Sequence, residues 1–157
     1  MLNNSSELDQ DTAYQKFLNT PVTAEDFFPK PVHIPSTLPT KLQTFIQRIY
    51  TSTMIGRTYM FPSDPCMIWL GAVDEDGYGR IRVPQCATVD KPSVILSRFV
   101  YQHLVEDVDP DLEIHHQCGE PSCINTRHLS PLTPTRNKEI GDPWHNPDTN
   151  PWLAHLR

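Results

Sequence analysis

The chain has 157 residues, a formal net charge of −6, 38% hydrophobic residues and sixteen prolines. This length predicts one domain, with or without an accessory arm, and the prolines predict few long regular elements, because proline breaks helices and cannot donate in a sheet. The sequence has neither a run of about 18 apolar residues nor a basic segment followed by an apolar one, which argues against a membrane span and secretion and favours an intracellular, cytoplasmic or nuclear protein.

Residues 1–60 are predicted to form an accessory region or arm. Within it, SELDQDTAYQKFLN can form a short helix that Ser6 caps, with Tyr14, Phe17 and Leu18 on one face. The proline-rich stretch PVTAEDFFPKPVHIPSTLPT follows, and we expect it to be mostly extended.

A clearer helix is predicted in TKLQTFIQRIYTSTMIG, residues 40–56. Thr40 can cap it, Gly56 can end it, and its apolar stripe consists of Leu42, Phe45, Ile46 and Ile49. Two interpretations stay open. The helices of the N-terminal region either pack against the main domain or form an arm that binds a partner or a second copy of the chain.

Short antiparallel strands are predicted between residues 61 and 100. CMIWLGAV is a strand candidate, DEDGYG is typical of a turn, and RIRV provides the returning strand. DKPSVILSRFVYQHLV can run from a strand into a helix, and its apolar residues suit a buried face.

The motif CGEPSCINTRH places Cys118, Cys123 and His128 in a C-x4-C-x4-H pattern. Zinc prefers thiolate and imidazole ligands in a tetrahedron, so this pattern predicts three ligands of a structural zinc ion. A fourth ligand must come from elsewhere in the sequence, and Cys66 and Cys86 are the thiol candidates. Disulfides are the alternative use of four cysteines, which the absence of a secretion signal disfavours.

A second constellation follows the metal motif. LSPL is predicted to be extended, and Thr133 can cap a helix that begins at Pro134, which puts Asn137 about one turn into that helix. A strand with His116, a metal-bound loop, a strand and this helix would fold back and place His116 opposite Asn137. A neutral imidazole can take a proton from water, and an asparagine oxygen can bind a hard divalent ion, so the pair suits phosphodiester hydrolysis.

The stretch HHQCGEPSCINTRHLSPLTPTRN resembles the His-Cys box homing endonucleases and the phage HNH endonucleases, which are built on the ββα-metal (His-Me) finger. The interval of 21 residues between His116 and Asn137 agrees with the family pattern, and CMIWLGAVDEDGYGRI resembles the phage pattern C-x-x-W-x-G followed by GYGR. The resemblance covers residues 66–141. The matching positions in the first stretch are His116, Cys118, Cys123, Asn125, His128, Leu129, Thr133 and Asn137.

The resemblance implies an α+β fold, in which residues 61–142 form a small zinc-stapled ββα-metal domain with a short antiparallel sheet. The partly helical, proline-rich extension 1–60 precedes this domain, and a tail, 143–157, follows it. The resemblance also implies a metal-dependent DNA endonuclease. In such an enzyme His116 would be the general base, and Asn137 would be the ligand of Mg²⁺ or a similar ion. Cys118, Cys123 and His128 would bind structural Zn²⁺, with Cys66 preferred over Cys86 as the fourth ligand. Arg80 and Arg98 are candidate phosphate contacts.

The chain departs from the phage pattern at Ser97, where histidine is usual, at Thr126, where proline is usual, and at His115, where an acidic or small residue is common. No third of the chain is basic, although duplex DNA attracts positive surface. The alternative function is therefore an inactive finger that binds nucleic acid or protein. Either function leaves room for a homodimer or a larger assembly, held through the N-terminal region.

Overall fold

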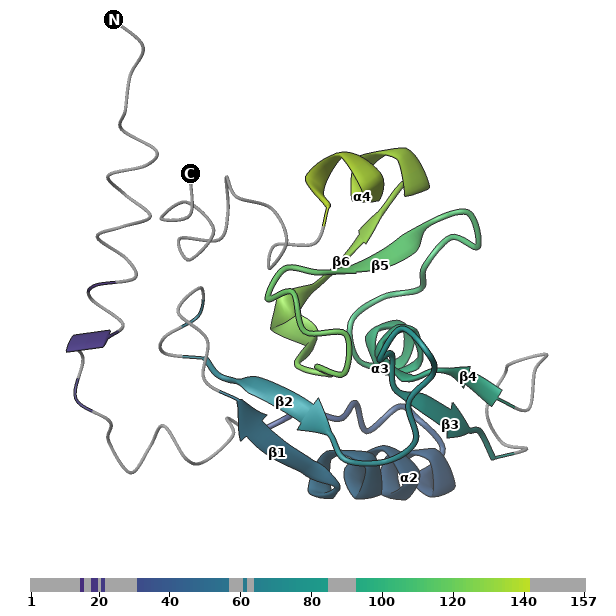
Figure 1. Cartoon of the computed structure of the whole chain (residues 1–157). Helices are drawn as coiled ribbons and strands as arrows, with labels where there is room; N and C mark the ends of the chain where they lie inside the picture. Colours follow the sequence, from purple (N-terminus) through teal and green to yellow (C-terminus); the bar gives the residue numbers. More distant parts are fainter. Residues whose placement is uncertain are drawn as a thin grey trace, which may run out of the picture.

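The computed structural model describes residues 31–56, 61, 64–84 and 93–141, together with positions 15, 18, 19 and 21. Within these residues the chain forms an α+β fold with three two-stranded antiparallel sheets, which confirms the predicted class (Figure 1). The elements are α2 (Thr40–Thr51), β1 (Thr53–Gly56), β2 (Cys66–Trp69), β3 (Arg80–Arg82), β4 (Ser93–Ile95), α3 (Leu96–Leu104), β5 (Glu113–His116), η2 (Thr126–His128), β6 (Leu129–Leu132) and α4 (Pro134–Ile140).

Helix α2 packs into the main core, as one of the two interpretations of the N-terminal region expects. Its apolar stripe buries Leu42, Ile46 and Ile49, and Phe45 meets Phe99 of α3 edge to face, with ring centroids 5.9 Å apart. Strand β1 then pairs with β2, from Thr53 opposite Trp69 to Gly56 opposite Cys66. The predicted boundary at residue 60 is thus crossed by a strand pair and by a shared core.

Two predicted ends of the α2 helix were wrong. The cap position is Pro39, which has no polar side chain, and Thr40 is already the first helical residue. The helix ends at Thr51 and not at Gly56, because residues 53–56 are taken into the β1–β2 pair. The pairing with β2 supplies the backbone hydrogen bonds that a continued helix would otherwise have made.

The turn at residues 74–78 forms as predicted, but it does not join β2 directly to β3. Asp74 accepts hydrogen bonds from the backbone of Asp76 and Tyr78, and Gly77 adopts a positive φ of 87°. Strand β3 pairs with β4, while β2 lies between β1 and the metal-motif loop. On that second side Ile124 N–H donates to Met67 O at 2.8 Å, and Trp69 N–H donates to Ser122 O at 2.9 Å. Both edges of β2 are therefore occupied.

The last third of the described chain follows the predicted order of strand, loop, strand and helix. Strand β5 pairs with β6, with His116 opposite Leu129 and His115 opposite Ser130. Helix α4 starts at Pro134, and the Thr133 hydroxyl accepts from the Arg136 N–H at 3.2 Å, as expected for its cap. Figure 1 shows α3 in the middle of the molecule, with β5, β6 and α4 on one side of it and α2 on the other.

Some predictions fall outside the described residues. They are the Ser6 cap with Tyr14 and Phe17, Cys86, and the tail 143–157; Leu18 is described and exposed. Among the described helices, none has the length and apolar character that crossing a bilayer requires.

Truncation of Ile46 tests whether α2 belongs to the core. Ile46 is fully buried, so Ile46→Ala should lower the free energy of unfolding by about 2–5 kcal/mol, measured by urea denaturation with metal present. Gln47→Ala, on the exposed side of the same helix, should change it by less than about 0.5 kcal/mol. Equal effects of the two variants would mean that α2 is dispensable to the core.

Candidate functional site

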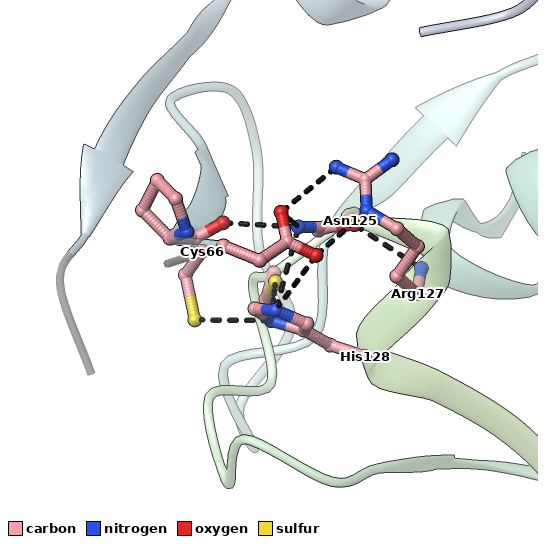
Figure 2. Close-up of polar contacts among 7 residues, drawn as sticks. Cys66, Asn125, Arg127 and His128 are labelled. Carbon is pink, nitrogen blue, oxygen red and sulfur yellow. Dashed lines mark hydrogen bonds and ion pairs between the residues drawn. The ribbon is translucent and has the colours of Figure 1, made fainter. Parts of the chain in front are cut away.

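The structure brings Cys66, Cys118, Cys123 and His128 together. Their ligand atoms all lie within 4.8 Å of one another and all four residues are buried. His128 Nδ1 lies 3.6 Å from Cys66 Sγ and 3.7 Å from Cys123 Sγ (Figure 2). Tetrahedral zinc with bonds of about 2.0–2.3 Å would place neighbouring ligand atoms about 3.5–3.8 Å apart. The cluster could therefore hold a metal such as zinc, with Cys66 in the fourth position.

The three thiols compete for ionisation at this site. Hydrogen bonds from Cys123 and Cys66 hold the pKa of Cys118 far below its ordinary value. The hydrogen-bond contact with Cys118 is the main cause that raises the pKa of Cys66 and of Cys123 above the ordinary range for a thiol, and burial and repulsion by the Cys118 thiolate raise both further. A bound cation would relieve this repulsion, since metal ligation favours the thiolate form.

The loop that carries two of these cysteines is anchored to the rest of the fold by its backbone. Gly119 takes a positive φ of 74° and donates to His116 O at 3.0 Å, which turns the chain after β5. The Tyr50 hydroxyl of α2 donates to Ile124 O at 2.8 Å. The metal cluster is thereby fixed to α2, β2 and β5.

A pocket of about 220 Å³ adjoins the loop. It contains both residues of the predicted catalytic pair, together with one lysine that the sequence reasoning did not single out. Its lining consists of Tyr78, Ile114, His115, His116, Gly119, Pro121, Asn137, Lys138 and Gly141.

His116 is buried, and its ring orientation is set by the metal loop. Its Nε2 lies 3.2 Å from the backbone oxygen of Cys123. A carbonyl can only accept, so Nε2 carries the hydrogen and Nδ1 keeps a free lone pair. Burial lowers the pKa of His116, outweighing the opposite influence of Cys118 and the Cys123 carbonyl, so the ring is neutral at pH 7.

Asn137 forms a hydrogen bond with His115, the neighbour of His116 in β5. His115 Nδ1 lies 2.8 Å from Asn137 Oδ1, and Asn137 Nδ2 donates to Glu113 Oε2 at 2.8 Å. Glu113 and His115 share one face of β5 because side chains alternate along a strand. The same alternation puts His115 and His116 on opposite faces of β5, but it does not tell which face meets Asn137.

The two candidate arginines have different surroundings, and neither lines the pocket. Arg98 donates to the backbone oxygens of Leu112 at 2.6 Å, Asp109 at 3.0 Å and Val108 at 3.3 Å, and so holds the segment before β5. Arg80 makes longer contacts to Ser93, at 3.4 Å to its backbone oxygen. The cation on the pocket wall is Lys138, which is exposed.

Substitution of single cysteines tests the fourth ligand. Cys66→Ser should lose bound metal and most of the stability, because metal binding supplies folding free energy in small sites. Cys86→Ser is the matched control and should retain one metal ion per chain. Elemental analysis measures the metal content of each variant, and thermal melting before and after chelation measures its stability. Metal loss in Cys86→Ser with metal retained in Cys66→Ser would reverse the assignment.

Comparison with known proteins gives a phage relative. The chain is 32% identical over 76 residues to a protein of Escherichia phage T7 called Protein 7.7, a name that states no activity. The aligned segment is 48% of this chain and 54% of the phage protein, so the chain spans about half the length of that relative. No family model matches the chain, and no solved structure matches it significantly.

Proposed function

We propose that the chain is a metal-dependent endonuclease of the HNH, or His-Me finger, type, which hydrolyses phosphodiester bonds in DNA. The observation that carries the proposal is that His116 and Asn137 line the same pocket, with the tautomer of His116 set by Cys123 O. The order β5, loop, β6, α4 and the cysteine–histidine cluster support the resemblance on which the choice of DNA rests.

His116 is proposed as the general base. Its free Nδ1 takes a proton from a water molecule, while Nε2–H stays bonded to Cys123 O and shares the positive charge that develops on the ring. The water oxygen forms the new bond to phosphorus as the bond from phosphorus to the leaving oxygen breaks. The fixed ring needs no reorientation during the step, which is the advantage of a preorganised base.

Asn137 is proposed to hold the divalent ion, with His115 beside it. The amide oxygen suits Mg²⁺, which takes few protein ligands, keeps several waters and binds substrate phosphate. His115 Nδ1 lies 2.8 Å from this oxygen and, because the oxygen can only accept, donates a hydrogen bond that helps to fix its position. When bound, the ion would stabilise negative charge on the phosphate and the leaving oxygen.

Glu113 orients the Asn137 amide. An ionised carboxylate only accepts hydrogen bonds, so the Asn137 NH₂ group must face Glu113 and its oxygen must face His115. Without Glu113 the amide could rotate and present NH₂ where the ion requires oxygen.

Lys138 is proposed as the phosphate contact on the pocket wall. It is exposed and next to Asn137 in α4, so its ammonium group can approach a phosphodiester in the pocket. Arg98 is assigned a structural role because its donors are directed at three backbone carbonyls. Arg80 stays a candidate for contact with DNA outside the pocket.

The net charge of −6 favours a second function, an inactive finger that binds nucleic acid or protein within a larger assembly. Nonspecific DNA affinity comes mainly from positive charge, so an acidic chain would need a second copy or a partner to hold duplex DNA. Nicking of supercoiled plasmid separates the two functions, because the inactive finger would not cut under any metal condition.

The base assignment is tested by His116→Ala in that plasmid assay with Mg²⁺ or Mn²⁺. The variant should stay folded and metal-loaded and nick about 10²–10⁴ times more slowly than the unmodified chain. His103→Ala removes a histidine on α3 that does not line the pocket, and it should keep near-normal activity. Undiminished nicking by folded His116→Ala would refute the proposed base.

The role of Glu113 is tested by titrating the divalent ion. Glu113→Ala should raise the Mg²⁺ concentration for half-maximal nicking by about 10–100-fold, as loss of a hydrogen bond to a metal ligand typically does. Glu75→Ala removes an exposed acid from the 74–78 turn and serves as control. Mn²⁺ binding, which can be measured from the electron spin resonance signal of the ion, should be weaker in Glu113→Ala but not in Glu75→Ala. Equal Mn²⁺ affinity in both variants would contradict the proposal that Glu113 orients the Asn137 amide.

A further inference from the structure

The metal cluster has an outer partner that neither the sequence motif nor the proposed nuclease mechanism uses. The carboxylate of Asp64 faces the edge of the His128 ring that points away from the sulfurs. His128 Nδ1 is directed at the thiols, and on the opposite edge Nε2 lies 3.8 Å from Asp64 Oδ2. A ring that binds metal through Nδ1 must carry its hydrogen on Nε2, so it needs an acceptor on that side.

Asn125 is the other side chain close to His128 Nε2, at 3.4 Å, but it cannot be that acceptor. The atom in contact is Nδ2, whose hydrogens are donated to Asp64 Oδ1 at 3.0 Å and to Pro65 O at 3.0 Å. The amide oxygen of Asn125 is turned away and accepts from Arg127 N–H at 3.1 Å. Of these neighbours, Asp64 is therefore the group that can receive the Nε2–H of His128.

Arg127 and Asn125 hold Asp64 in place from two directions. Arg127 donates to both carboxylate oxygens, from Nε at 2.6 Å and from a terminal nitrogen at 2.8 Å, and Asn125 adds a third hydrogen bond. The Asp64 side chain is only 17% exposed. A bidentate arginine contact to a shielded carboxylate restricts both its position and its rotation.

Phe61 restrains the remaining face of the ring. It stacks on His128 with centroids 4.0 Å apart and an interplanar angle of 21°. Asp64 N–H donates to Phe61 O at 3.2 Å, and Cys66 follows two residues later. One short segment thus supplies a ligand thiol, a carboxylate at the ring edge and an aromatic ring on its face.

We infer that Asp64 is a positioning residue of the metal centre: it selects the His128 tautomer that presents Nδ1 to the metal, and Arg127 holds it there. Carboxylates that receive the second N–H of a ligand histidine raise the basicity of that ligand and fix its ring. This inference concerns metal affinity and does not depend on the nuclease proposal. A simple ion pair that only joins residues 64 and 127 is the competing explanation.

Metal affinity of the full chain distinguishes the two explanations. Asp64→Asn keeps the size of the side chain and removes its charge, and it should bind Zn²⁺ about 10–100-fold more weakly in competition with a chromophoric chelator. With Co²⁺ in place of Zn²⁺, the visible absorption bands should also shift. Asp76→Asn, an exposed aspartate in the 74–78 turn, is the matched control and should change neither quantity.

Arg127→Met removes the ion pair but leaves the carboxylate, and it should weaken Zn²⁺ binding less than Asp64→Asn does. Equal losses in these two variants, or unchanged affinity in Asp64→Asn, would overturn the inference in favour of a plain ion pair. If Asp64→Asn does not fold, Asp64→Glu and Asp64→Gln decide the question. The carboxylate role requires tighter Zn²⁺ binding by the glutamate than by the glutamine, and equal affinity would refute it.

Discussion

The convergence of three thiols and one imidazole at a single buried point is the constraint on which the rest of this structure depends. Cys66 comes from β2, Cys118 and Cys123 come from the loop after β5, and His128 comes from η2. Three thiolates cannot be buried side by side without a cation, because their mutual repulsion and the loss of hydration would both oppose folding. A bound metal ion would turn this unfavourable cluster into a cross-link between segments 52 to 62 residues apart in sequence.

The same cross-link reaches the pocket through the backbone. Cys123 belongs to the cluster through its sulfur and fixes the His116 ring through its carbonyl oxygen. The loop is also bound to α2 by Tyr50 and to β2 by two backbone hydrogen bonds. A bound metal ion would anchor this loop and so hold the His116 ring in one orientation. The cysteine–histidine cluster and the pocket are therefore joined through a single loop.

Charge is distributed so that the pocket differs from the chain as a whole. The chain has a net charge of −6, yet the pocket wall presents two histidines, an asparagine and a lysine. Glu113, which is not among the residues that line the pocket, accepts a hydrogen bond from the Asn137 amide at 2.8 Å. Under the proposed function such a lining would receive a divalent ion and a phosphate, while the acidic remainder of the chain would give little general attraction for duplex DNA. This contrast is the physical reason why the proposed nuclease would need a second copy or a partner to bind its substrate.

The sequence by itself determined the ligand types of the metal motif and the Thr133 cap of α4, because spacing and capping are local properties, and its resemblance to a known family implied the α+β class. For the fourth metal ligand, residue chemistry allowed either Cys66 or Cys86, and the resemblance favoured Cys66. The fold brings Cys66 into the cluster, while Cys86 lies outside the described residues. Only the tertiary structure decided that β2 pairs with β1, that Arg98 binds backbone carbonyls, and that His115 and Glu113 contact Asn137. These contacts join residues distant in sequence, and their geometry depends on how whole elements pack, which no short pattern encodes.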